Sequence, residues 1–186
     1  MDVRNGLKNL NLVDCVIPRT FNGKKVYGLA YRCFHSAPNI VKVFIPKTST
    51  IFIGDSFANC KQIKEIFFED GFHNVNLSSY TLIGASITSF RFPIGSSIGD
   101  FFFAESKIQD IYIYDFMSFN TKETFDKCLQ AINIYVPVNY PYNSFGGKSV
   151  KKILPNYIQN VESKAFQFCC LYNHLSSALP FIFLFV

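Results

Sequence analysis

The sequence contains no tryptophan, only 2 methionines and only 3 histidines among its 186 residues. Charged residues make up 17% of the chain and apolar residues 49%, a composition that argues against intrinsic disorder. The apolar share includes 22 phenylalanines, and there are also 10 tyrosines. Aromatic and β-branched side chains favour strands, so we expect one β-rich domain of ordinary size.

Long hydrophobic segments are also missing. The N-terminal stretch MDVRNGLKNLNLVDCVIP has no apolar core of about 7 to 15 residues, so we expect no signal peptide there. The C-terminal stretch ALPFIFLFV is apolar over about nine residues, less than half of the roughly 20 that a membrane-spanning helix needs. We therefore expect no transmembrane segment, and a final strand or a continuing chain at this end.

Clusters of one charge sign are scarce. The 18 basic residues exceed the 13 acidic ones, but they are scattered along the chain. The tightest groups are the pairs Lys24-Lys25 and Lys151-Lys152, and neither belongs to a long basic run. Nucleic-acid binding is therefore not expected.

Motifs for metal binding or catalysis are absent or incomplete. The six cysteines show no C-x-x-C or Cys/His ligand spacing, and the histidines have no nucleophile or carboxylate at a recurring position. The stretch Gly146-Gly147-Lys148-Ser149 resembles the end of a phosphate-binding loop, but Tyr142 stands where that motif needs glycine. We expect a turn there, and we expect no enzyme, no metal and no cofactor.

The sequence does contain a repeat. Segments with alternating apolar residues, the pattern of a strand with one buried face, end every 21 to 24 residues. The residues that follow these segments are Pro46, Glu69, Pro93, Tyr114 and Pro137. Looser copies end at Ile17-Pro18, Leu154-Pro155 and Leu179-Pro180. A period of about 20 to 29 residues with one short strand per unit is typical of a leucine-rich-repeat solenoid.

The interiors of the units agree as well. Phe57 and Cys60 follow Pro46 at the same distances at which Phe125 and Cys128 follow Tyr114. Phe166 and Cys169 repeat this spacing after Pro155, whereas Tyr80 and Gly84 are expected at these positions in the intervening unit. Asp55 or Ser56 would cap a short helical turn that points Phe57 and Cys60 into the core.

The units IPKTSTIFIGDSFANCKQIKEIFF and LPNYIQNVESKAFQFCCLYNHLSSALP resemble BspA-like leucine-rich repeats, which occur in surface proteins of bacteria and parasitic protists such as trichomonads. The resemblance covers roughly residues 16–180 and implies about six or seven repeats. It implies a β-rich α/β fold: a right-handed leucine-rich-repeat solenoid with a parallel sheet on one face and short turns or helical pieces on the other. Residues 1–15 would form a lead-in or cap, 138–150 an irregular turn insert, and 181–186 an apolar end.

The outward side chains of the strands are the candidate binding site. One outward row reads Phe44, Phe67, Arg91, Tyr112 and Tyr135, and the adjacent row reads Lys42, Glu65, Ser89, Asp110 and Asn133. Aromatic residues and arginine are enriched in the hot spots of protein interfaces, although aromatic ladders can also simply stabilise a sheet. The residues expected to contact a partner are Phe44, Glu65, Phe67, Arg91, Asp110, Tyr112 and Tyr135.

The expected function is therefore a non-catalytic recognition or adhesion module. The resemblance implies a cell-surface antigen-like protein whose partners are host or neighbouring-cell proteins. The alternative is an intracellular scaffold or structural repeat protein, which the missing secretion signal favours. If the chain is secreted, Cys15 and Cys33 are the pair to check for a disulfide, and the sequon at Asn76 would accept a glycan.

Overall fold

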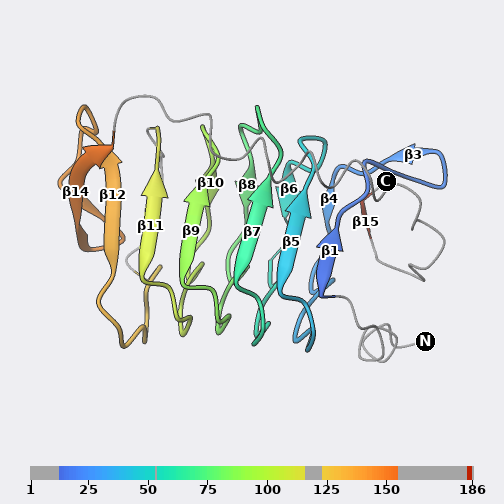
Figure 1. The fold of residues 1–186 in the computed structure, drawn as a ribbon, viewed down its shortest axis with the longest axis horizontal. Coiled ribbons are helices and arrows are strands. Elements are labelled where there is room, and N and C mark those ends of the chain that lie inside the picture. The colour runs from blue at the N-terminus through green and yellow to red at the C-terminus, as the bar shows by residue number, and fades with distance from the viewer. Residues whose placement is uncertain (1–12, 53, 116–122, 155–183, 186) are drawn as a thin grey trace.

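The structure, a computed structural model, describes residues 13–52, 54–115, 123–154 and 184–185. Short strands lie side by side in two rows along the long axis of the molecule (Figure 1). The front row comprises β1 (Asp14–Val16), β5 (Lys42–Ile45), β7 (Glu65–Phe68), β9 (Ser89–Phe92), β11 (Asp110–Ile113), β12 (Asn133–Pro137) and β14 (Lys148–Leu154). Strands β1, β5 and β7 form one parallel ladder and β9, β11, β12 and β14 another, with β9 next to β7. The predicted solenoid of parallel strands is confirmed.

The back row is built from shorter strands. It comprises β4 (Gly28–Leu29), β6 (Ile51–Phe52), β8 (Asn76–Leu77) and β10 (Ser97–Ile98), all parallel, with β15 (Leu184–Phe185) antiparallel to β4. The remaining strands belong to two antiparallel hairpins. One pairs β2 (Thr20–Phe21) with β3 (Lys24–Lys25), and the other pairs β13 (Ser144–Phe145) with β14. Gly146 and Gly147, at φ 53° and 77°, form the second hairpin's turn, as predicted for this stretch.

A column of buried side chains runs through the core from turn to turn. Backbone hydrogen bonds from Phe34 to Ser56, from Phe57 to Thr81, from Leu82 to Phe102 and from Phe103 to Thr124 fix its register. The rings of Phe34 and Phe57 stack 5.3 Å apart, and those of Phe103 and Phe125 stack 6.0 Å apart. Leu82 therefore occupies the phenylalanine position of the intervening unit, and the expectation of Tyr80 there was wrong.

The cysteine position shows the same shift. Cys60 donates a backbone hydrogen bond to Phe57, and Ala85 donates the equivalent bond to Leu82, so Ala85 rather than Gly84 matches Cys60. Residues 54–59 form hydrogen-bonded turns and no helix, so neither Asp55 nor Ser56 caps the helical turn that the sequence suggested. Asp55 lies in the left-handed region at φ 62°, so it cannot be the N-cap of a helix.

Left-handed residues recur at two positions of the turns. The first position is occupied by Arg32, Asp55, Tyr80 and Phe101, at φ 57° to 62°. The second is occupied by Ser36, Asn59, Gly84, Glu105 and Lys127, at φ 54° to 63°. A residue in this region interrupts the right-handed helical path, so the chain makes a succession of tight turns at these places.

The buried cysteines are part of this core. Cys15, Cys33 and Cys60 are buried free thiols, and the Sγ of Cys60 donates a hydrogen bond to the carbonyl of Phe34 at 3.1 Å. Burial raises the pKa of the Cys15 and Cys60 thiols to about 12, and it also raises the pKa of the Cys33 thiol. Cys15 and Cys33 are thus not joined by a disulfide in this structure, and Cys128 is a half-buried free thiol.

Several expectations lie outside the described residues. They concern Phe166, Cys169, the repeat copy ending at Leu179-Pro180, and most of the segments 1–15 and 181–186. The domain bounds therefore stay a prediction. Among the described residues, no helix is long and apolar enough to cross a membrane, and no three potential metal ligands lie together.

Candidate functional site

The outward side chains of the front row form two lines that cross the strands. We call Phe44, Phe67, Arg91, Tyr112 and Tyr135 the aromatic row, and Lys42, Glu65, Ser89, Asp110 and Asn133 the polar row. Strand register places Phe44 beside Phe67, and Tyr112 between Arg91 and Tyr135. It likewise pairs Lys42 with Glu65, and Asp110 with both Ser89 and Asn133. Along each strand, side chains alternate between the core and this outer face, because successive side chains point to opposite sides of a sheet.

At one end of the aromatic row, two phenylalanines stack. The ring centroids of Phe44 and Phe67 are 5.0 Å apart with an interplanar angle of 14°. Phe44 is 9% exposed and Phe67 is half-buried, so these rings cover each other while Phe67 keeps contact with solvent. Val16 extends the line on β1, where it pairs with Phe44 and is 38% exposed. This end of the row is an apolar surface.

At the other end, a stacked pair of tyrosines is flanked by two cations. The rings of Tyr112 and Tyr135 stack 5.0 Å apart with an interplanar angle of 19°. The guanidinium carbon of Arg91 lies 5.2 Å from the centre of the Tyr112 ring, and the Lys151 ammonium lies 5.5 Å from that of Tyr135. The faces of aromatic rings are electronegative and attract cations, so the two tyrosines are held between two positive charges.

The polar row is organised by side-chain contacts between neighbouring strands. Lys42 and Glu65 form an ion pair at 3.6 Å. Further along, the Asn133 amide donates to the Asp110 carboxylate at 2.9 Å, and the Lys151 ammonium donates to the Asn133 carbonyl oxygen at 2.8 Å. Desolvation, with a further contribution from the negative charge of Asp110, raises the pKa of Tyr135. The tyrosine hydroxyl therefore stays protonated at neutral pH and can donate or accept a hydrogen bond.

Sequence reasoning missed Lys151. Counting back from Pro155, as for the other units, places Ile153 in the aromatic row. Strand pairing instead places Lys151 opposite Tyr135 and Leu154 opposite Pro137, with a register shift between Val136 and Pro137, and Ile153 is exposed. A β-bulge of this kind depends on pairing between strands, so no spacing within the sequence could have revealed it. The sequence did signal that a strand ends near Leu154.

The two rows offer contact and hydrogen bonding rather than reaction chemistry. They bring aromatic faces, two cations, two carboxylates and one carboxamide to one side of a parallel sheet. All seven residues predicted to contact a partner lie on this face, with Phe44 mostly covered by its neighbours. Repeat solenoids commonly use extended faces of this kind for binding.

A family profile described as a BspA type leucine rich repeat region matches the chain in six copies, within residues 9–96 and 27–140. A search among curated proteins gives no significant match. Among solved structures, a leucine-rich repeat protein from Bacteroides ovatus ATCC 8483 aligns with 20% identity and a TM-score of 0.46. That alignment covers 70% of this chain and 41% of the other, so the chain spans less than half of that protein's length. Because the family profile matches most of the sequence, the chain belongs to the BspA-type leucine-rich repeat family.

Proposed function

We propose that this chain is a non-catalytic protein-recognition module that binds its partner through the aromatic row and the polar row. Leucine-rich-repeat families typically serve protein interaction, and their solenoids are typically non-catalytic. The surface specific to this chain is the one formed by the aromatic row and the polar row. The proposed contact residues are Phe44, Glu65, Phe67, Arg91, Asp110, Tyr112 and Tyr135, with Lys151 at the end of the row.

The observation that carries the proposal is the stacked pair of half-buried tyrosines held between two cations along one line. Arg91, Tyr112 and Tyr135 are all half-buried, so each keeps a rigid, preorganised position and still reaches solvent. A partner that covers these side chains would lose little side-chain entropy, because stacking already restricts their rotation. Tyrosine and arginine in such settings dominate the binding energy of many interfaces.

The partner chemistry follows from the two ends of the row. The phenylalanine end favours an apolar patch, and the tyrosine end, with Arg91 and Lys151, favours acidic and aromatic groups. We further propose that the partner is a host or neighbouring-cell surface protein and that the module acts in adhesion. Proteins of this family are often extracellular or attached to the cell surface, which supports this setting. A glycan on the exposed Asn76 of the native protein would show passage through a secretory route.

The competing interpretation is that the rings form a ladder that only stabilises the sheet. The test is the triple variant Phe67→Thr, Tyr112→Thr and Tyr135→Thr, because threonine keeps the strand preference while removing the rings. Wild type and variant are used to capture surface proteins from intact host cells, with circular dichroism to verify folding. A matched control replaces Tyr27 and Tyr142, which are exposed aromatics outside the two rows, with threonine.

The proposal expects a captured protein that the control retains and that the folded triple variant loses. Equal capture by wild type and by the folded triple variant would contradict binding through the aromatic row. If the triple variant is too unstable, Arg91→Gln and Lys151→Gln together test the tyrosine end without removing a ring.

A further inference from the structure

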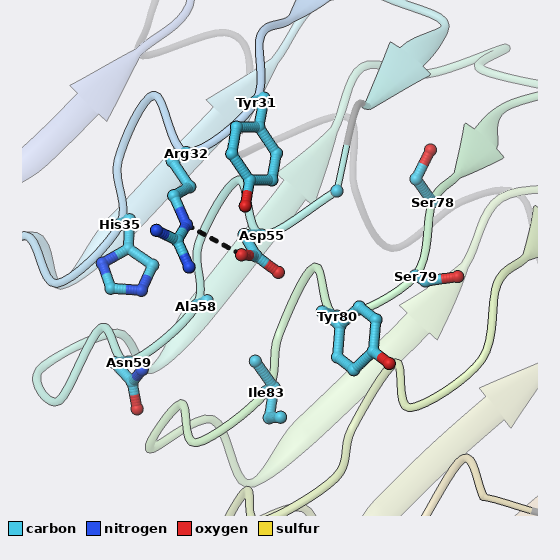
Figure 2. Close-up of a pocket in the computed structure, with 11 residues that line it drawn as sticks. Tyr31, Arg32, His35, Asp55, Ala58, Asn59, Ser78, Ser79, Tyr80 and Ile83 are labelled. Atoms are coloured by element: carbon cyan, nitrogen blue, oxygen red, sulfur yellow. Dashed lines mark hydrogen bonds and ion pairs between the residues drawn. The ribbon is translucent and has the colours of Figure 1, made fainter.

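A second candidate site lies on the turns, away from the two outward rows. Side chains of three successive turns, at residues 31–35, 54–59 and 78–83, line an open pocket of about 640 Å³ (Figure 2). This volume is within the range of about 300 to 1,000 Å³ that small-molecule sites occupy. None of the residues proposed above for partner binding lines it.

The hollow arises because the middle turn carries small side chains at two positions where a neighbouring turn carries a larger one. Backbone hydrogen bonds from Arg32 to Gly54 and from Asp55 to Ser79 align the three turns residue by residue. Gly54 is therefore the counterpart of Tyr31. By the same register, Ala58 is the counterpart of His35 and of Ile83. A glycine and an alanine in the middle unit leave a trough whose sides are formed by the longer side chains of the adjoining units.

Two exposed tyrosines form the sides of this trough. Tyr31 is 59% exposed and Tyr80 is 41% exposed, and Figure 2 shows them on two sides of Asp55. The ring of Tyr80 stacks on Phe101 at 5.1 Å with an interplanar angle of 5°, and the guanidinium of Arg32 lies 5.1 Å from the centre of the Tyr31 ring. Each ring is thus supported by a neighbour and presents a large apolar surface. The two tyrosines belong to units two repeats apart, or roughly 10 Å at the usual strand spacing.

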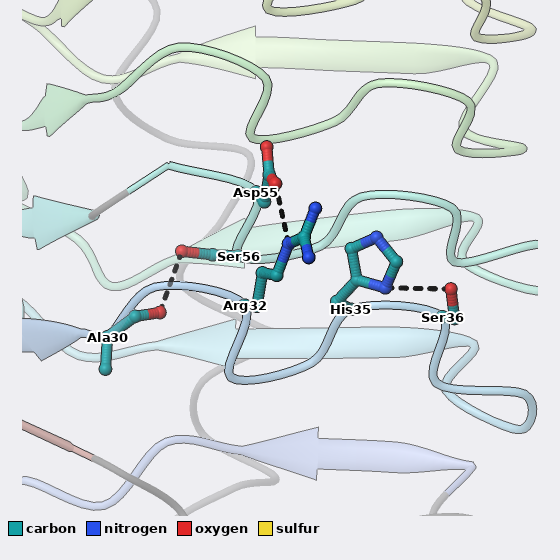
Figure 3. A network of polar contacts seen from close by, with 6 residues as sticks. All are labelled: Ala30, Arg32, His35, Ser36, Asp55 and Ser56. Atoms are coloured by element: carbon teal, nitrogen blue, oxygen red, sulfur yellow. Dashed lines mark hydrogen bonds and ion pairs between the residues drawn. The ribbon is translucent and has the colours of Figure 1, made fainter. Parts of the chain in front are cut away.

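The polar groups between the tyrosines carry no net charge. The Nε of Arg32 donates to the Asp55 carboxylate at 2.9 Å, and the imidazole of His35 contacts the hydroxyl of Ser36 at 2.9 Å (Figure 3). The ion pair neutralises both members, and the Asp55 side chain is only 14% exposed. The other polar groups that line the pocket are uncharged, namely the amide of Asn59 and the hydroxyls of Ser78 and Ser79.

This combination points to one class of ligand. A sugar ring has an apolar face of C–H groups, which packs on aromatic rings, and an equator of hydroxyls, which pair with carboxylates, amides and hydroxyls. An anionic ligand fits less well, because the carboxylate beside Arg32 already compensates the positive charge of the pocket. We propose that this pocket binds a short, neutral oligosaccharide whose rings pack on Tyr31 and Tyr80 and whose hydroxyls meet Asp55 and Asn59.

The experiment starts from the full chain on an array of neutral oligosaccharides of two to four rings, with inorganic phosphate titrated separately. Affinity for the best array sugar is then measured by calorimetry for wild type and for the double variant Tyr31→Ser and Tyr80→Asn. Asparagine is chosen because residue 80 has a φ of 61°, a conformation that asparagine tolerates. Tyr142→Ser, which removes another exposed tyrosine, is the matched control, and Tyr31→Ser alone serves if the double variant is unstable.

We expect a neutral sugar to bind, the double variant to lose about tenfold in affinity or more, and the control to bind as wild type. Asp55→Asn should also weaken sugar binding. The proposal is overturned if no neutral sugar binds, or if the double variant binds the sugar as well as wild type. It is equally overturned if phosphate binds and Asp55→Asn strengthens that binding, since the pocket would then be an anion site.

Discussion

Replacing Phe57 by alanine should be far more damaging than replacing Phe67, although both rings stack on a neighbour at nearly the same distance. The Phe34–Phe57 centroids are 5.3 Å apart and the Phe44–Phe67 centroids 5.0 Å apart. Phe57, however, is 0% exposed within the core column, whereas Phe67 is half-buried on the outer face. The comparison therefore separates the residues that hold the solenoid together from those that we assign to binding.

The magnitudes follow from burial. Truncating a fully buried phenylalanine costs about 3 to 5 kcal/mol, because the lost transfer energy and the cavity add together. Truncating Phe67 removes one stacked pair and a partly buried ring, which lowers the free energy of unfolding by about 1 to 2 kcal/mol. Since a domain of this size is stable by about 5 to 15 kcal/mol, Phe57→Ala should remove a large part of the total free energy of unfolding.

The assay is urea unfolding followed by circular dichroism at pH 7. Phe57→Ala should lower the midpoint by on the order of 1 to 2 M and Phe67→Ala by less than half as much. Phe57→Leu, which matches the leucine found naturally at position 82 of the same column, is the conservative control and should recover most of the loss. Equal losses for Phe57→Ala and Phe67→Ala would refute the assignment of the two rings to core and surface.

Two further predictions concern the thiols and the back row. Burial raises the pKa of Cys15 and Cys60 from 9.0 to about 12, so the unfolded chain ionises these thiols first as pH rises. Their contribution to stability should be complete below about pH 9 and fall towards pH 12, by up to about 1.4 kcal/mol per pH unit for each thiol. Urea melts between pH 8 and 10.5 measure this, and a Cys15→Ala variant with the same pH slope as wild type would disprove it. Gly28→Ala should destabilise by about 3 kcal/mol or more, because an added Cβ would collide with the backbone carbonyl of Ile51. Gly23→Ala, in a turn with open space around it, should cost only the strain of its left-handed backbone at φ 76°, about 1 to 2 kcal/mol. Equal thermal melting of the two variants would contradict the close approach of β4 and β6.

The repeat and its strands could be predicted because both depend on short-range spacing. Strands β5, β7, β9 and β11 end one residue before Pro46, Glu69, Pro93 and Tyr114, where the alternating pattern placed their ends. The phenylalanine and cysteine positions of the core column could be predicted only in units whose loop after the strand has the same length. The stretch from Glu69 to Leu82 is two residues longer than that from Pro46 to Phe57, so counting reached Tyr80 instead of the true core residue. Loops absorb such insertions at little cost, whereas the core column must stay aligned.

Of the two candidate sites, one could be predicted from the sequence and the other could not. The aromatic row follows from period-two alternation and could be predicted, apart from the near-complete burial of Phe44 and the strand pairing that places Lys151 beside Tyr135. The pocket could not be predicted, since it depends on the size difference between Gly54 and Tyr31 at aligned positions of neighbouring turns. That alignment is fixed by backbone hydrogen bonds between units, which no single repeat reveals.

Binding through the aromatic row is tested most directly by photo-cross-linking on intact host cells. Tyr112 is replaced by p-benzoylphenylalanine, which keeps an aromatic ring in the middle of the tyrosine end, and the exposed Tyr142 is replaced in the same way as the control. Binding on the aromatic row predicts one dominant protein adduct from position 112 that the position 142 variant does not give. An adduct from position 142 with none from position 112, or the same adducts from both, would contradict the claim that the partner binds on the aromatic row.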